Sequence, residues 1–412
     1  VNFTGGILIE KYQTRKKKIL VATLIINLGL LGYFKYFGTL TEAITGLFSA
    51  DGTGTTLFQV ALPIGISFYT FQALSYVIDV YRGEVPAQHN FWHMLLYISF
   101  FPQLIAGPII KYRDIAAQIT GRKETIRKFA AGIMRFCWGL GKKVLLANSF
   151  ARVVDEIFKY GPYAVSRKAL WLGAILYMMQ IYYDFSGYSD MAIGLGRIFG
   201  FRFSENFNYP YISASITGFW RRWHISLGGW FRDYLYIPLG GNRVKPVRHV
   251  FNILVVWAAT GFWHGASWNF VLWGLLYAVL LLFEKYILRP KRRHAVLMRI
   301  YTMLFVALGF VLFDSASIAD AFVSFKSLFG FAGIPAVNTA SLYYLKSNLV
   351  LLGVAAVGAT PLPKRIYEKL GGTTGGSRAL TVLTPTAAAA SIAVCTAYLI
   401  DGSFNPFVYF RF

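Results

Sequence analysis

The chain has 412 residues, of which 56% are hydrophobic and only 14% are charged, and its formal net charge is +23. A soluble domain usually carries about 25% charged residues, whereas this sequence repeats apolar stretches that approach the roughly 20 residues needed to cross a bilayer. A soluble globular protein is therefore excluded, and a polytopic all-α membrane protein is predicted. Because lysine and arginine gather in short cytoplasmic loops, the basic excess does not indicate a nucleic-acid partner.

Apolar runs bounded by basic or Gly/Pro-rich loops predict the membrane helices. The basic cluster from Arg15 to Lys18 places the start of the first run in the cytoplasm. In chain order, the predicted spans are 19–37, 57–78, 129–157, 169–199, 250–262, 268–288, 299–317, 345–361 and 379–400. We expect one membrane domain over 1–412, with about eight to eleven helices.

Two apolar segments are expected to be interrupted. Between 90 and 110, Pro102 and Pro108 break the pattern, which predicts a re-entrant pair of half-helices that is buried in protein. The span at 169–199 is expected to form two shorter helices with a break near Gly187.

Three further segments lack the pattern of a span. Residues 201–247 are rich in Trp, Tyr and Arg and are predicted to be interfacial or re-entrant. An amphipathic stretch near 319–331 is expected to lie along the membrane–water interface. Residues 371–377 are predicted to form a Gly/Thr/Ser linker.

Charged residues within the predicted spans need protein or water around them. Lys142 and Lys143 lie midway along one span, and Asp184 and Asp190 lie in the next. The two aspartates could serve a proton or ion path, so a transporter remains an alternative at this point.

Among the six histidines, His264 is the main candidate for chemistry. It lies in Gly-Phe-Trp-His-Gly-Ala-Ser-Trp-Asn at 261–269, between two strongly apolar runs, and an ionisable residue at membrane depth is a functional hypothesis by default. Imidazole, with an ordinary pKa of about 6.5, suits a general base. The alternative is a core histidine bonded to a carbonyl group.

His224 is the second candidate, in Phe-Trp-Arg-Arg-Trp-His-Ile-Ser-Leu at 219–227. Trp220 and Trp223 would form part of an aromatic belt, and Arg221 and Arg222 could bind phosphates or lipid headgroups. An interfacial helix that these residues merely anchor is an equal alternative. We expect His249 and His294, which lie in basic loops, to be solvated or to face headgroups, and His89 and His93 to be weaker candidates.

Other chemistries are not indicated. Cys137 and Cys395 lie in apolar runs and are expected to be core residues, not a disulfide or zinc framework. The sequence has few carboxylates and scattered histidines, so no metal site is predicted. It also has no Gly-x-Ser-x-Gly motif of a serine hydrolase.

At 220–227 and 263–269 the sequence resembles the membrane-bound O-acyltransferase superfamily, and more narrowly the branch that holds the membrane subunit of alginate O-acetylation and its cellulose and peptidoglycan counterparts. Further motifs of that branch lie, in order, at 63–72, 101–108, 183–190, 206–210 and 404–412. Members of the branch begin with additional apolar segments, and this chain starts at Val1 without an initiator Met. We therefore expect that one or two native N-terminal helices precede it.

The resemblance implies a ring of tilted transmembrane helices with re-entrant and interfacial helices, in the bacterial inner membrane. It makes His264 the principal catalytic residue and His224 the second signature position. The expected reaction moves an acetyl group from a cytoplasmic thioester, acetyl-coenzyme A or a carrier protein, to the outside, where a separate acetyltransferase partner modifies a polysaccharide. No bound cofactor is implied; besides the donor and that partner, only membrane lipid is expected.

Within this scheme, His264 would act as the general base, and Asn269, the Trp263 indole and backbone amides are candidate donors to the oxyanion. His224, with Arg221 and Arg222, is assigned to the donor tunnel, as are Trp220 and Trp223. The alternatives are D-alanyl or fatty-acyl transfer on the same fold, a transporter or polysaccharide exporter, and a non-catalytic scaffold.

Overall fold

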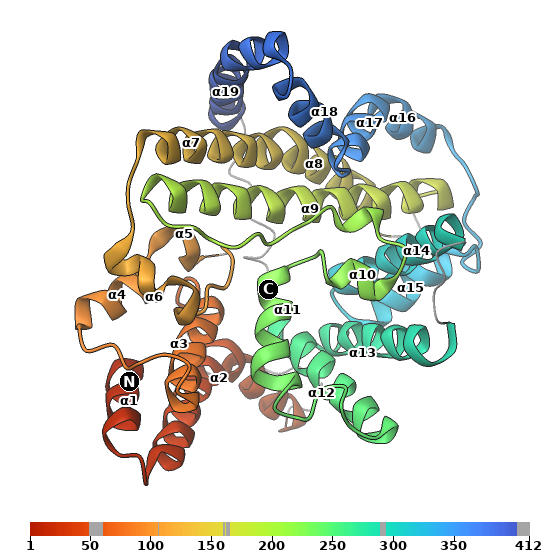
Figure 1. Cartoon of the computed structure of the whole chain (residues 1–412). Helices are drawn as coiled ribbons and strands as arrows, with labels where there is room; N and C mark the ends of the chain where they lie inside the picture. The colour runs from red at the N-terminus through yellow and green to blue at the C-terminus, as the bar shows by residue number, and fades with distance from the viewer. Residues whose placement is uncertain (49–60, 106, 160, 162–164, 289–293, 402–412) are drawn as a thin grey trace.

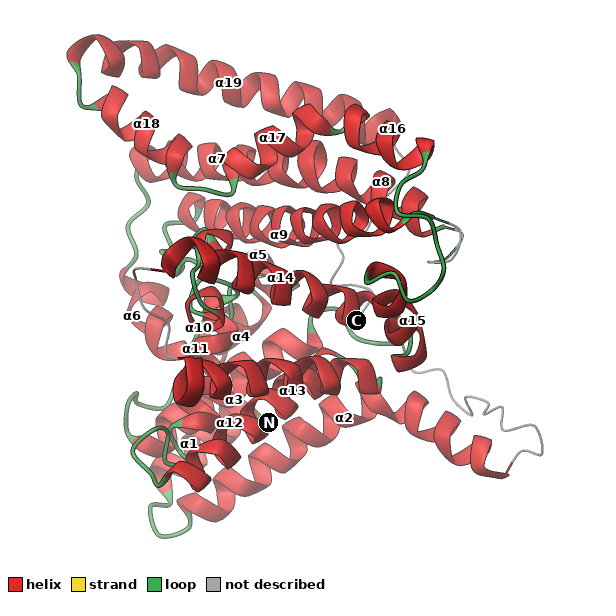
Figure 2. Ribbon diagram, turned by 90° about the vertical axis from the view of Figure 1, so that its right-hand side faces the viewer, coloured by secondary structure: helices red, strands yellow, loops and turns green. Residues whose placement is uncertain are grey.

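The computed structural model describes residues 1–48, 61–105, 107–159, 161, 165–288 and 294–401. Within these ranges the chain forms helices and loops and no strand (Figure 2). The α-helices are α1 (Asn2–Lys11), α2 (Lys16–Phe48), α3 (Ile66–Arg82), α4 (Phe91–Ser99), α5 (Phe101–Leu104), α6 (Tyr112–Gly121), α7 (Ile126–Gly141), α8 (Asn148–Phe158), α9 (Arg167–Ile198), α10 (Ile216–Trp220), α11 (Ile225–Phe231), α12 (Pro246–His264), α13 (Trp268–Phe283), α14 (Ala295–Asp314), α15 (Ile318–Leu328), α16 (Thr339–Ser347), α17 (Leu349–Gly358), α18 (Leu362–Gly371) and α19 (Thr374–Asp401).

Several of these helices are long and apolar enough to cross a membrane. In the described ranges they are α2, α13 with its continuation to Leu288, α14 and α19, and the bent pair α16 and α17 would make a fifth span. This pattern confirms a multi-pass membrane protein. The span predicted at 345–361 falls on this pair and is not one straight helix, because α16 and α17 meet at Asn348 with a bend of 52°. The number of eight to eleven membrane helices stays a prediction, and the described chain also contains many shorter helical segments.

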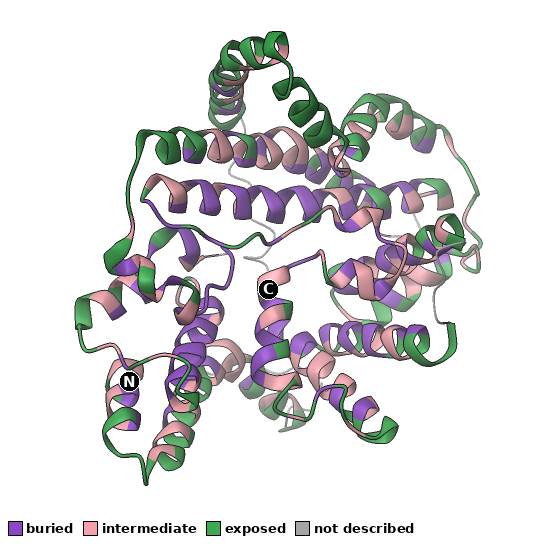
Figure 3. Cartoon of the chain, in the orientation of Figure 1, coloured by how far each residue is buried: buried purple, intermediate pink, exposed green. Residues whose placement is uncertain are grey.

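Helix α9 lies at the centre of the fold, alongside α7 (Figure 1), and most of its length is buried (Figure 3). The predicted break near Gly187 is wrong, since α9 runs without interruption. Gly187 instead permits a close helix crossing, where a Cβ atom would lie 2.8 Å from the carbonyl oxygen of Gly139 on α7. Gly194 permits the same close approach to Gly132 of α7, about two helical turns further along. The glycines therefore serve packing and not a turn.

The two carboxylates of α9 form ion pairs with cations on α7 and on the turn that follows it. The Lys143 ammonium lies 2.5 Å from a carboxylate oxygen of Asp184, and that of Lys142 lies 2.6 Å from Asp190. Arg135 on α7 makes a second contact with Asp190, at 2.5 Å. Both lysines belong to a π-helical turn that follows α7, Lys142–Ala147. The expectation that they face protein is confirmed, and the carboxylates of α9 are occupied by structural ion pairs.

Several boundaries differ from the sequence prediction. The interruption within 90–110 is confirmed as two short helices, α4 and α5, and their re-entrant placement stays a prediction. The linker predicted at 371–377 is wrong, because α18 ends at Gly371 and α19 already begins at Thr374. The run predicted from 57 begins as helix only at Ile66, with 57–60 outside the described residues. The motif at 404–412 also lies outside them.

Helices α12 and α13 form the hairpin that the sequence predicts, and they pack at glycines. A Cβ atom on Gly261 would lie 2.2 Å from the carbonyl oxygen of Phe270, and one on Gly274 would lie 2.2 Å from that of Trp257. Both overlaps are with backbone, which cannot rotate away. The separation of the two helices therefore depends on the absence of side chains at these positions.

We predict that Gly261→Ala destabilises the fold by about 1–3 kcal/mol, the usual cost of overpacking. The measurement is the thermal unfolding midpoint of the purified protein in detergent. Gly29→Ala on α2 is the matched control, because no atom lies within 4 Å of the Cβ it would add, and its midpoint should stay at or above that of the wild type. Equal midpoints for Gly261→Ala and the wild type would contradict the proposed packing.

Candidate active site

A cavity of about 1240 Å³ runs along one face of α12. The α12 residues that line it recur at helical spacing: His249, Ile253, Val256, Trp257, Thr260 and His264. Fifteen residue steps separate the first from the last, which corresponds to about 22 Å along the helix axis. The cavity is therefore long, and His264 lies at one end of this stripe.

The His264 side chain is buried among aromatic rings. The rings of Trp263, Trp273 and Phe313 lie edge-on to the imidazole, with centroids at 4.9, 5.2 and 5.2 Å. Trp273 and Phe313 also line the cavity. The imidazole is thus enclosed by aromatic rings and still contacts the cavity.

His224 lies in the same cavity, in the strained connection between α10 and α11. Its backbone has φ of 44°, a left-handed conformation that a non-glycine residue rarely adopts. Asn206 holds it there, because its Oδ1 accepts from the backbone N–H of Ser226 at 3.2 Å and from the Ser226 hydroxyl at 2.9 Å. The same oxygen lies 3.2 Å from His224 Nδ1, so Nδ1 is the nitrogen that carries a proton to donate.

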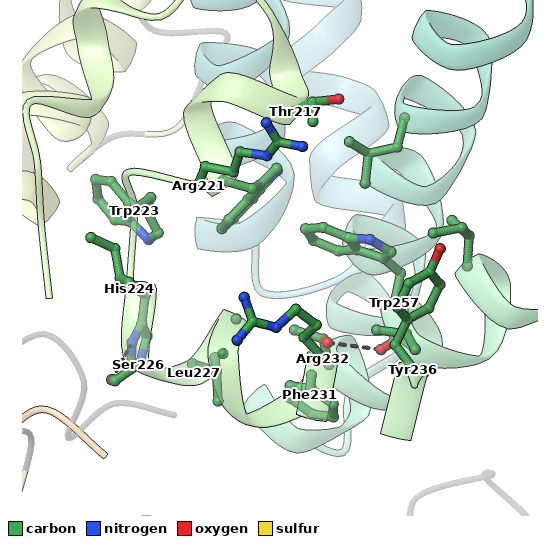
Figure 4. A pocket seen from close by; sticks show the side chains of 18 of the residues that line it. Thr217, Arg221, Trp223, His224, Ser226, Leu227, Phe231, Arg232, Tyr236 and Trp257 are labelled. Carbon is green, nitrogen blue, oxygen red and sulfur yellow. Dashed lines mark hydrogen bonds between the residues drawn. The ribbon is translucent and has the colours of Figure 1, made fainter. Parts of the chain in front are cut away.

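Four cationic side chains also line the cavity, together with the carboxylates of Asp114, Glu205 and Glu284 and many apolar residues. Figure 4 shows the guanidinium groups of Arg221, which directly follows α10, and of Arg232, in the π-helical turn after α11, projecting into it. Lys111 and Lys285 line it as well, and Lys111 lies 2.5 Å from the carboxylate of Asp233. The cavity thus joins a buried imidazole to a polar region in which cationic side chains slightly outnumber carboxylates.

His249 is a correction to the sequence prediction, which placed it among solvated or headgroup-facing residues. It is buried and lines the cavity at the start of α12. The Lys285 ammonium donates to its Nε2 at 3.0 Å, and its Nδ1 lies 3.0 Å from the Tyr286 hydroxyl. The basic composition of 243–249 predicted a solvated loop, but the hairpin partner α13 ends beside it and covers the ring.

Glu284 fixes the beginning of α10 and was not predicted as a site residue. Its carboxylate accepts from the backbone N–H groups of Ile216, at 2.5 Å, and Thr217, at 3.0 Å, and from the Thr217 hydroxyl at 2.8 Å. An anion at a helix N-terminus satisfies amides that have no partner within the helix. Glu284 therefore positions the short helix that leads into Arg221 and His224.

The residues predicted from the sequence divide into two groups. Those that line the cavity are Trp220, Arg221, Trp223, His224 and His264. Arg222 instead donates to the carbonyl oxygen of Asn208 at 3.0 Å, and Asn269 donates to that of Ser315 at 2.6 Å. Trp263 packs on Phe71, with ring centroids 5.4 Å apart. In the part of the chain that the structure describes, no group of His, Cys, Asp and Glu side chains is placed to hold a metal ion.

A multi-pass membrane protein with histidines and arginines along one elongated cavity is the class of molecule defined by this fold and site. The chain belongs to the membrane-bound O-acyltransferase family, whose characteristic sequence pattern matches residues 82–315. It is therefore an O-acyltransferase.

Known proteins resemble it over most of its length. The probable alginate O-acetylase of Azotobacter vinelandii is 38% identical over 94% of this chain and 83% of that protein. The probable alginate O-acetylase of Pseudomonas aeruginosa is 41% identical over 81% of this chain and 65% of that protein. The peptidoglycan O-acetyltransferase of Helicobacter pylori is 34% identical over 81% of this chain and 69% of that protein. The chain thus spans about two thirds of the length of some of these relatives and more of others.

We predict that Glu284→Ala lowers the free energy of unfolding by about 1.5–3 kcal/mol, the usual contribution of hydrogen bonds to a charged group. The change leaves the first amides of α10 without their acceptor. The measurement is thermal unfolding in detergent. Glu368→Ala on α18 is the control, since its exposed pair with Lys364 at 3.8 Å should contribute little. Equal effects of the two substitutions would refute the role of Glu284.

Proposed function

We propose that this chain takes an acetyl group from a cytoplasmic thioester and delivers it through the membrane for O-acetylation of an extracytoplasmic polysaccharide. One observation carries the proposal: His264 and the cationic side chains line a single elongated cavity along α12. The similarity to alginate and peptidoglycan O-acetylating proteins supports acetyl as the group transferred. The reaction is acyl transfer from sulfur to oxygen.

In this mechanism His264 is the general base. Its imidazole nitrogen removes the proton of an acceptor hydroxyl as that oxygen attacks the thioester carbonyl carbon. The tetrahedral intermediate collapses by breaking the carbon–sulfur bond, and the departing thiolate takes the proton from the imidazolium. General-base assistance of this kind contributes about 10² to 10⁴ in rate. The aromatic enclosure of the imidazole would exclude competing water.

The cationic side chains would hold the phosphates of the donor, whether these belong to acetyl-coenzyme A or to the prosthetic arm of a carrier protein. Guanidinium groups bind phosphate oxygens in a bidentate manner, and Arg221 and Arg232 project into the cavity (Figure 4). The thioester would then extend along α12 toward His264. His224, with its Nδ1 held by Asn206, borders this path as a second polar contact.

The charge distribution supports a cytoplasmic donor side. The basic start of α2 and the basic sequence at 290–294 are typical of cytoplasmic ends in a bacterial inner membrane. The donor therefore stays inside, and only the acetyl group has to cross. A ring of tilted helices around a thin centre, and an extracytoplasmic acetyltransferase that receives the group, complete the proposal.

His264→Ala should abolish turnover of acetyl-coenzyme A because the variant lacks the base. The assay measures release of free coenzyme A thiol by the purified protein in lipid nanodiscs, with the thermal midpoint as a check of folding. His294→Ala, an exposed histidine before α14, is the control and should retain wild-type turnover. Unchanged turnover in His264→Ala would refute the assignment. If the wild-type protein does not turn over acetyl-coenzyme A but does turn over a D-alanylated carrier protein, acetyl is refuted as the transferred group.

Arg221→Gln and Arg232→Gln should each raise the KM for acetyl-coenzyme A about tenfold, the loss expected for a charge-assisted contact of about 1.4 kcal/mol. The matched substrate is S-acetyl-N-acetylcysteamine, a thioester without phosphates, whose KM should not change. Arg243→Gln, an exposed arginine outside the cavity lining, serves as the control variant. An equal rise in KM for both substrates would show that the arginines do not recognise phosphate.

A further inference from the structure

Lys35 is a cation in the middle of an apolar helix. No other lysine or arginine occurs between Lys18 and Arg82 in the sequence. Lys35 belongs to α2, which is one of the helices long and apolar enough to span the membrane. A charge at such a position is costly and requires a polar partner, so it marks a site with a role.

The partners of Lys35 lie in the last turn of α12, which carries His264. Its ammonium donates to the carbonyl oxygen of Trp263 and lies 5.4 Å from the centroid of the Trp263 ring. The neighbouring residue, Tyr36, donates its hydroxyl to the carbonyl oxygen of Phe262 at 2.7 Å. The Tyr36 ring also stacks on that of Phe262, with centroids 4.4 Å apart. Two consecutive residues of α2 thus hold the two peptide groups that precede His264.

These contacts supply hydrogen-bond donors to carbonyl groups at the end of α12 that have no partner within the helix. Helix α12 ends at His264, and Gly265 continues in an extended conformation with φ of −175°. The last four carbonyl groups of a helix have no partner within it, and in an apolar membrane interior each must find one. A cation is also favoured at this end by the helix dipole. Lys35 and Tyr36 therefore determine where the last turn of α12 lies.

Lys35 does not line the cavity, whereas His264 does. It therefore lies outside the lining that would contact a bound donor, and its effect on the reaction would pass through His264, by holding the backbone of the last turn of α12 and by its positive charge near the imidazole. A catalytic imidazole must lie within a fraction of an ångström of its working position, since displacement by about 1 Å can cost about 100-fold in rate.

We propose that Lys35 is a positioning residue for the acyl-transfer reaction: with Tyr36 it holds the last turn of α12 and so fixes the His264 imidazole at the end of the cavity. The inference rests on the proposed function of His264. It predicts a defect in the chemical step and not in donor binding, together with rescue by arginine, which keeps the charge and the donor groups.

Lys35→Met, which preserves length and removes the charge, should lower kcat for acetyl-coenzyme A about 10- to 100-fold while leaving KM unchanged. Lys35→Arg should restore kcat to within about threefold of the wild type, because its guanidinium can reach the same carbonyl group. Tyr36→Phe, which keeps the stacked ring, should give a smaller decrease in kcat. Lys17→Met removes the same charge from the exposed start of α2 and should behave as the wild type.

Each outcome separates this inference from the proposed function. If His264→Ala is inactive while Lys35→Met and Tyr36→Phe turn over like the wild type, the positioning role is refuted and the role of His264 stands. A change in KM with constant kcat would also refute it, because Lys35 would then act on donor binding. If Lys35→Met does not yield folded protein, the comparison of Tyr36→Phe with the wild type decides, and an unchanged kcat there overturns the proposal. Wild-type protein without any acyl turnover would refute the proposed function itself.

Discussion

The need to satisfy every backbone polar group within an apolar surrounding governs the structure around the site. Helices meet this need along their length but not at their ends, where amides or carbonyls lack partners. Here the helix ends are where the candidate chemistry lies: α10 ends just before Arg221, α11 begins after His224, and α12 ends at His264. A polar site inside a membrane protein therefore comes with a set of backbone groups that other side chains must bind.

The side chains that do this come from distant parts of the sequence. Glu284 accepts from the first amides of α10, 67 and 68 positions away, and Lys35 reaches the carbonyl of Trp263 across 228 positions. Asn206 binds the start of α11 and His224 together. Each contact links two elements of the fold, so the geometry of the site and the packing of the helices depend on the same few hydrogen bonds.

This explains which features the sequence could predict. His264 and His224 stand out because their surroundings in the chain are local: apolar runs on both sides of one, and tryptophans and arginines around the other. His249 and Glu284 could not be recognised in this way, because their roles arise only when α13 folds back beside the start of α12. The predicted break near Gly187 failed for a related reason, since a glycine that marks a close helix crossing looks the same in sequence as one that marks a turn.

Helix α12 combines three constraints on different parts of its surface. One face lines the cavity from His249 to His264, while Gly261 brings its backbone against α13 without room for a side chain. Its C-terminal carbonyls are bound by α2. A helix held at these places can neither rotate nor slide without losing a contact, so the distance between its basic end and the imidazole is constant. The proposed donor, with a charged head and a reactive group on a long arm, would require such a fixed distance, because binding at one end would then place the thioester at the other.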